Sequence, residues 1–181
     1  MAFTHDTDLA LQYAVALVNT RPTRTHGEGL ATLEQLNAQL GEYDWTGEYA
    51  TTEDELETVR RVRDRLREYW DADIERVVAI TNGLLRDANA LPQLVTHEPL
   101  GWHIHATEDD APLAVRLAVD TAMAMIDVVR ADELDRLKVC AGEDCDDVLV
   151  DLSRNRSRKF CDGTCGNNAA VAAYRARQAE L

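Results

Sequence analysis

The chain has 181 residues, 45% of them hydrophobic, which is enough to form the core of one ordinary domain and argues against disorder. No run approaches the roughly 18 apolar residues that span a bilayer, so we expect no membrane partner. The net charge of −14 argues against a chain that binds nucleic acid along its whole length.

The N-terminal quarter has the pattern of two helices. Apolar residues at helical spacing predict a first helix within 6–20, with Asp6 or Thr7 as its N-cap. After a polar loop, a leucine stripe predicts a second helix over 30–40 that ends at Gly41.

Two further helices are predicted in the middle of the chain. The segment 52–70 begins with a Thr52 cap and acidic residues, carries an apolar stripe, and ends in arginines, an order that suits the helix dipole. Its Arg60–Arg67 run is interleaved with acids, which favours a solvated face over a nucleic-acid patch. Apolar spacing predicts another helix within 71–90.

The pattern then changes from helical to alternating. Short runs around a Pro-Leu-Gly interruption predict a β-hairpin near 93–107. The segment 111–131 follows, with Pro112 near its first turn, and its density of Ala, Val, Leu and Met predicts a central buried helix. We therefore expect residues 1–137 to form a mainly α domain with one hairpin (α+β), followed by a separate module over 138–181.

All four cysteines lie in this last module, as Cys140, Cys145, Cys161 and Cys165. The first ten residues lack an export signal, and the arginine and alanine bias hints at a bacterial genome, so we expect a bacterial cytoplasmic protein. In a reducing cytoplasm, clustered cysteines suggest a metal before a disulfide.

Two local cysteine pairs are an economical way to build a tetrahedral Zn²⁺ site. The first pair forms a knuckle, and the second, four residues apart, lies at the start of a helix. Between them, a β-like run at 148–152 is followed by a turn and a short return. This order of knuckle, hairpin and helix predicts a treble-clef-like zinc finger. Four protein ligands leave no open position, which argues against catalytic zinc; the alternative is free or disulfide-linked cysteines packed as apolar groups.

Positive charge surrounds the cysteines. Residues 138–181 carry no net charge, so the whole −14 belongs to residues 1–137, whereas 152–178 carries +5. The basic residues of that stretch are candidate phosphate contacts for duplex DNA: Arg154, Arg156, Arg158, Lys159, Arg175 and Arg177. Two alternatives remain open: the stretch docks on the acidic domain, or Arg175 and Arg177 merely complement the helix C-terminus.

The motifs "CAGEDC", "LSRNRSRKFC" and "CGNN" have the spacing C-x4-C-x15-C-x3-C followed by Gly-Asn, and they resemble the CGNR zinc finger. In that family the finger closes the chain of ABATE-domain proteins, which are inferred to be stress-induced bacterial transcription regulators. The N-terminal region resembles the ABATE part in its order of elements. The resemblance implies that the four cysteines are zinc ligands and that "DLSRNRSRKF" is the family's basic stretch. Asn168 departs from it by replacing the signature arginine, which removes one cation.

Other candidate chemistry is sparse. His103 and His105 alternate on one predicted strand, with His97 on its partner, and three imidazoles on one hairpin suit a metal or a small ligand. Ordinary hydrogen-bonded histidines are the more common outcome. Asp146 and Asp147 beside the knuckle are expected to orient the backbone or to bind nearby arginines. The motifs of common hydrolases, metalloproteases and nucleotide-binding enzymes are absent, so we expect no enzyme.

Three functions are consistent with these patterns. The first is a transcription regulator whose finger binds DNA and whose N-terminal domain senses a ligand or a partner. The second is a protein-interaction or scaffold module with purely structural zinc. The third is a small-molecule-binding protein with the histidine hairpin at a pocket.

Overall fold

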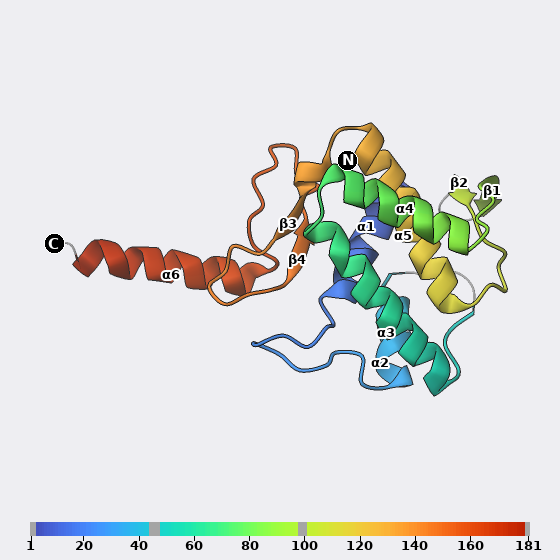
Figure 1. The fold of residues 1–181 in the computed structure, drawn as a ribbon. Helices are drawn as coiled ribbons and strands as arrows, with labels where there is room; N and C mark the ends of the chain where they lie inside the picture. Colours follow the sequence, from blue (N-terminus) through green and yellow to red (C-terminus); the bar gives the residue numbers. More distant parts are fainter. Residues whose placement is uncertain (1–2, 44–47, 98–100, 180–181) are drawn as a thin grey trace.

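The computed structural model describes residues 3–43, 48–97 and 101–179. It has a helical body from which one long C-terminal helix projects (Figure 1). The α-helices are α1 (His5–Val18), α2 (Leu33–Glu42), α3 (Glu53–Arg67), α4 (Ile74–Asp87), α5 (Leu113–Arg130) and α6 (Gly163–Ala179). Short 3₁₀ turns follow α3 at Glu68–Trp70 and α5 at Leu134–Arg136. The predicted fold class, mainly α with a hairpin and a C-terminal finger, is confirmed.

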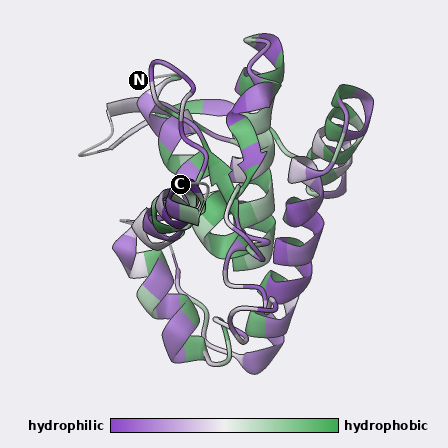
Figure 2. Ribbon diagram, turned by 90° about the vertical axis from the view of Figure 1, so that its left-hand side faces the viewer, coloured by the Kyte–Doolittle hydropathy of each residue, from purple (hydrophilic) through white to green (hydrophobic). Residues whose placement is uncertain are grey.

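The centre of the body is α5. It packs against α1, α3 and α4, and the buried side chains run along most of its length, from Leu113 to Val128. Its apolar character on nearly all sides explains this position, because a helix that is hydrophobic all round has to be covered by its neighbours. Figure 2 shows apolar residues gathered in the middle of the body and hydrophilic residues on its outer faces. The prediction of a central helix led by Pro112 is confirmed.

Capping decides where the outer helices begin. Thr52 caps α3 as predicted, and its hydroxyl accepts from the Glu55 backbone in a capping box. The predicted cap of α1 is wrong, because α1 begins after Thr4. Thr7 is instead buried inside the helix, where its hydroxyl donates to the Asp127 carboxylate at 2.6 Å.

The predicted end of the second helix at Gly41 is also wrong, because the helix continues to the next residue. Gly41 lies inside α2, which runs to Glu42. A Cβ at this glycine would meet nothing within 4 Å, so no close contact requires glycine there, and the residue does not interrupt the helix.

The predicted hairpin is formed by β1 (Gln93–His97) and β2 (Gly101–His105), which pair antiparallel. Gly101 adopts the left-handed region with φ +68°, a conformation that glycine enters without strain. The two faces of the hairpin differ: His103 is buried, whereas Leu94 and Trp102 expose 71% and 75% of their area. The side chain of His97 lies outside the described part of the chain.

A second strand pair joins the end of the body to the cysteine module. The run expected at 148–152 forms β4 (Val148–Val150), but its partner is β3 (Leu137–Val139), which precedes the first cysteine. The expected partner, the return segment after the turn, forms no strand. Val148 and Val150 of β4 belong to the hydrophobic core of the body, and Leu137 of β3 packs against that core, so both strands are anchored on the body.

Within the described residues, the helices are too short or too polar to cross a membrane.

Asp120 of α5 provides a pH test of this packing. Burial raises the pKa of its carboxyl to about 7, against the opposing influence of Arg116 and His103. The stability linked to its protonation is therefore full below the ordinary carboxyl pKa of about 4 and is lost as the pH rises through about 7. We expect Asp120→Asn to stabilise the protein more at about pH 8.5 than at about pH 6.

Urea denaturation of the native protein and the variant at both pH values measures this difference. Asp109→Asn is the control, since the Asp109 side chain is 92% exposed. An Asp120→Asn effect of equal size at both pH values would contradict the assignment.

Candidate metal centre

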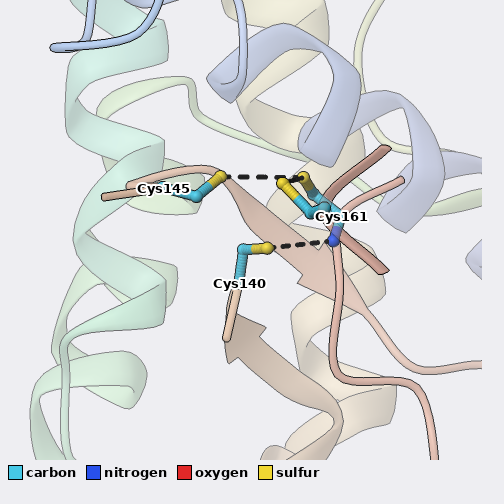
Figure 3. A group of neighbouring side chains, drawn as sticks. Cys140, Cys145 and Cys161 are labelled. Atoms are coloured by element: carbon cyan, nitrogen blue, oxygen red, sulfur yellow. Dashed lines mark hydrogen bonds between the residues drawn. The ribbon is translucent and has the colours of Figure 1, made fainter. Parts of the chain in front are cut away.

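The four cysteines meet at one point between β3, β4 and α6. One sulfur atom from each lies within 4.8 Å of the other three, and the Sγ atoms of Cys145 and Cys165 each lie 3.7 Å from that of Cys161. Figure 3 shows the Cys145 and Cys161 sulfurs pointing toward each other. A tetrahedron with Zn–S bonds of 2.3 Å spaces its sulfurs about 3.8 Å apart. The cluster therefore has the dimensions of a zinc–tetrathiolate site.

The sulfur–sulfur distances of 3.7 Å also exclude disulfide bonds between these cysteines. An S–S bond is about 2.05 Å long, and all four cysteines are free thiols. The thiol set is soft and closed, which suits zinc. With four thiolates bound, a tetrahedral ion would have no position left for water, so its role would be structural.

A tight loop between β3 and β4 positions the first pair of cysteines, Cys140 and Cys145. The Cys140 backbone N–H donates to the Asp147 carbonyl at 2.8 Å and closes the loop that carries Cys145. Gly142 lies inside this loop, where a Cβ would come within 3.1 Å of the Cys165 Sγ and 3.2 Å of the Cys145 Cβ. A larger residue at 142 would therefore push into the cluster.

A helix start forms the second half. The Asp162 side chain accepts a hydrogen bond from the Cys165 backbone N–H at 2.8 Å and caps the first turn of α6. This cap fixes Cys165 one turn after Cys161, as the four-residue spacing predicts. The direction of α6 therefore depends on the site that holds its first turn.

The electrostatics of the thiols favour a bound cation. Burial raises the pKa of the Cys145 thiol to about 12 and also raises the pKa of Cys161 and Cys165. Burial acts in the same direction on Cys140, but two backbone N–H groups donate to its sulfur and lower its pKa overall. One belongs to Cys161, as Figure 3 shows, and the other belongs to Gly142. Without a cation, the site therefore disfavours four thiolates, and a bound divalent metal would supply the missing positive charge.

A buried carboxylate next to the site organises the basic stretch. Asp151 is fully buried and accepts from Lys138 Nζ at 2.7 Å, the Arg158 backbone at 2.8 Å, and both the backbone N–H and hydroxyl of Ser153. Burial opposes its ionisation, but these donors outweigh it and lower the pKa of Asp151. In the sequence, Asp151 stood out only as the aspartate that opens the family's basic stretch.

Two of the six predicted phosphate contacts have partners inside the protein. Arg156 forms ion pairs with Glu133 at 2.7 Å and Asp135 at 3.1 Å, and its hydrogen bond to Asp135 raises its pKa. Arg158 folds back on the carbonyls of Phe160 and Cys161. Both guanidinium groups therefore brace the finger.

The other four predicted contacts point into solvent. They are exposed, and within the described residues they form no hydrogen bond or ion pair through their side chains: Arg154, Lys159, Arg175 and Arg177. Arg175 and Arg177 lie on α6, which has no buried residue and extends away from the body (Figure 1). A shallow cavity of about 420 Å³, lined in part by Arg158, Lys159 and Gly163, lies where the basic stretch meets α6.

The body contacts the finger through side chains that sequence patterns did not single out. The Asn19 amide bonds both the N–H and the carbonyl of Val148, at 2.8 and 2.9 Å. The Trp70 indole N–H donates to the Leu149 carbonyl at 2.9 Å. These partners are up to 129 residues apart in sequence, so no local pattern could have revealed them.

The knuckle is also held by the loop after α1. Arg24 pairs with Asp144 at 3.5 Å and Asp146 at 3.7 Å, and His26 Nε2 lies 3.1 Å from Asp147. The hydrogen bond that the protonated His26 ring donates to the Asp147 carboxylate raises the pKa of His26. The acidic residues of the knuckle thus bind an arginine, as expected of Asp146, and a histidine.

Comparison with known families gives two matches. Residues 11–132 match the ABATE family model, described as a putative stress-induced transcription regulator, and residues 136–178 match the CGNR zinc finger. A search of curated proteins finds no match to this chain.

Metal removal tests the dependence of the fold on the cluster. Because Val148 and Val150 belong to the core of the body, we expect chelation to lower the melting temperature by more than about 5 °C, at roughly 2–4 °C per kcal/mol. It should also change tryptophan fluorescence, since Trp70 bonds β4. Calorimetry, emission spectra and elemental analysis measure these effects.

Trp70→Phe is the control, and it should lose most of the fluorescence change. A metal-free protein with unchanged melting and emission would show that the cluster does not support the fold.

Asp151→Ala tests the buried carboxylate. It removes the partner of Lys138 and leaves the N–H groups of Ser153 and Arg158 without their acceptor. Breaking such a pair costs about 3 kcal/mol of unfolding free energy, measurable by urea denaturation. The exposed Glu143→Ala serves as control and should stay within about 0.5 kcal/mol of the native protein. A similar loss in both variants would refute a special role for Asp151.

Proposed function

The chain belongs to the ABATE family, and from this premise we propose that it is a non-enzymatic transcription regulator of the bacterial cytoplasm whose zinc finger binds duplex DNA. The observation that carries the proposal is the set of four exposed cations on the finger, which have no carboxylate partner in the described chain: Arg154, Lys159, Arg175 and Arg177. Phosphate contacts require cations free to leave solvent for the backbone of the duplex.

The distribution of charge supports the same surface. Residues 1–137 carry the whole net charge of −14, which would repel DNA. The projection of α6 away from this acidic body leaves room for a duplex to approach the finger (Figure 1). The metal cluster keeps this surface rigid, which limits the entropy lost on binding.

We propose that α6 enters the groove while the basic stretch binds the backbone. The helix exposes Asn167, Asn168 and Tyr174 beside Arg175. Amide side chains read adenine edges and arginine reads guanine edges in the major groove. Asn168 stands where the family has its signature arginine. At this position we therefore expect an amide contact to DNA in place of a cationic one.

Arg156 and Arg158 have a different role in this proposal. Their partners are Glu133, Asp135 and the finger's own carbonyls, so they shape the DNA-binding surface and do not contact phosphates. If each of the four exposed cations makes one phosphate contact, the slope of log K against log salt is about −3.6.

The proposed sensing role belongs to the helical body. Its loop after α1 reaches the knuckle through Arg24 and His26, and Asn19 and Trp70 bond β4. A ligand or partner that shifts these elements would therefore act directly on the finger.

A protein partner is the second candidate. The outer face of the β1–β2 hairpin favours it, because Leu94 and Trp102 are largely exposed there. A single stoichiometric partner that is lost in Trp102→Ser, together with no DNA binding, would favour this function over the first.

A salt-series titration with duplex DNA tests the proposal. We expect binding near about 50 mM salt, and we expect the Arg154→Ala/Lys159→Ala double variant to reduce the slope by about 1.8, half of the four-contact value. The control is Arg61→Ala/Arg130→Ala, which removes the same charge from exposed positions of the body. Absence of binding at low salt, or equal slopes in both double variants, would rule out this surface.

A further inference from the structure

The β1–β2 hairpin exposes a continuous apolar surface. The three most exposed large apolar side chains of the described chain lie on or beside it: Leu91, Leu94 and Trp102, at 70%, 71% and 75%. Leu94 pairs with Ile104 across the two strands, and Trp102 shares the face of Ile104 because it lies two residues away in β2. Leu94, Trp102 and Ile104 therefore form one apolar outer face.

A two-stranded sheet of this kind gains stability from a layer on its open face. An isolated hairpin is marginal in water. Within the described residues, β1 and β2 are the only strands of their sheet, and the body covers one face of it, where His103 is buried. A second apolar layer over the outer face would complete a sandwich of two sheets.

Charge indicates which molecule supplies that layer. Residues 88–97 and 101–106 contain no Asp, Glu, Lys or Arg, although charged residues make up 29% of the chain. A partner recognised through charge would need an opposite charge on this face. Two copies of a chain with net charge −14 repel each other, so they meet with least repulsion where the surface is uncharged. An uncharged apolar face also complements itself, as a twofold symmetric contact requires.

We propose that the outer faces of two copies pack against each other and form a twofold symmetric dimer. In this dimer, the Leu94, Trp102 and Ile104 side chains of both protomers are removed from water. Two strands of five residues make a face of about 17 by 10 Å. This area is well below the roughly 800 Å² that each partner buries in a standard interface. The dimer is therefore weak and forms as the protein concentration rises.

Acidic residues beside the face give the dimer a distinctive salt dependence. Glu108, Asp109 and Asp110 follow β2 and are exposed. Dimerisation brings these like charges of two copies nearer to one another, and dissolved salt screens their repulsion. Self-association should therefore strengthen as salt rises, whereas the binding of a basic protein beside the same carboxylates would weaken.

The dimer does not depend on DNA binding. The hairpin lies on the opposite side of the body from α6, so the fingers of both protomers stay accessible (Figure 1). Phosphate contacts weaken as salt rises, which is opposite to the behaviour expected of the dimer. The two proposals can therefore fail separately.

Sedimentation equilibrium of the zinc-loaded protein, without DNA, tests the dimer at concentrations from about 10 μM to about 1 mM. We expect a monomer–dimer equilibrium whose dissociation constant falls at least about threefold between about 50 and 500 mM NaCl. Trp102→Ser should raise the dissociation constant at least about tenfold, because it removes the largest side chain of the face. Tyr174→Ser is the control, since it removes an exposed aromatic residue from α6, and should leave the equilibrium unchanged.

A matched pair of variants at Thr96 guards against a folding artefact. Thr96 is exposed and lies opposite Trp102 on the outer face. Thr96→Glu adds a carboxylate to the face and should raise the dissociation constant at least about tenfold at low salt, whereas the uncharged Thr96→Gln should stay within about twofold of the native protein. Retained finger zinc and an unchanged circular dichroism spectrum show that each variant is folded.

A monomer at every concentration and salt overturns the proposal. It is also overturned by a dimer that weakens as salt rises, or by one that is as tight in Trp102→Ser and Thr96→Glu as in Tyr174→Ser.

Discussion

Four thiols that lie within 4.8 Å of one another in a partly buried site resist joint ionisation unless a cation binds them. This constraint shapes the C-terminal quarter of the chain. The knuckle after β3 has few apolar side chains, and α6 buries no residue. Hydrophobic packing therefore does not hold either element in position. A divalent ion bound by the four cysteines would hold both elements through direct bonds to sulfur, and it would fix the first turn of α6 relative to β4.

The finger and the body share their interior. Val148 and Val150 of β4 belong to the core of the body, and Asn19 and Trp70 satisfy the backbone groups of the same strand. The loop that carries Arg24 and His26 adds charge pairs at the knuckle. A change in the body can therefore reach the finger through hydrogen bonds and packing, which is the physical route that the proposed sensing role requires.

Local chemistry was predictable from the sequence, and long-range partners were not. Cysteine spacing predicted the cluster, the Thr52 cap predicted the start of α3, and apolar density predicted the central position of α5. The pairing of β4 with β3 was missed because three residues carry too weak a strand signal. The ion pairs of Arg156 with Glu133 and Asp135 were missed for a different reason. A basic run looks the same in sequence whether its charges meet phosphates or carboxylates, and only the fold distinguishes them.

The insertion of β4 into the core has a consequence for how such proteins evolve. Recombination could join this finger to the body of a distant relative. The β4 strand would then carry side chains that fit the core of this body and not the core of the other. The side chains at positions 19 and 70 would have to accompany the finger, although they are encoded far upstream of it. We therefore expect the body and the finger to be inherited together, and substitutions in one to be accompanied by substitutions in the other, even though each has its own sequence motif.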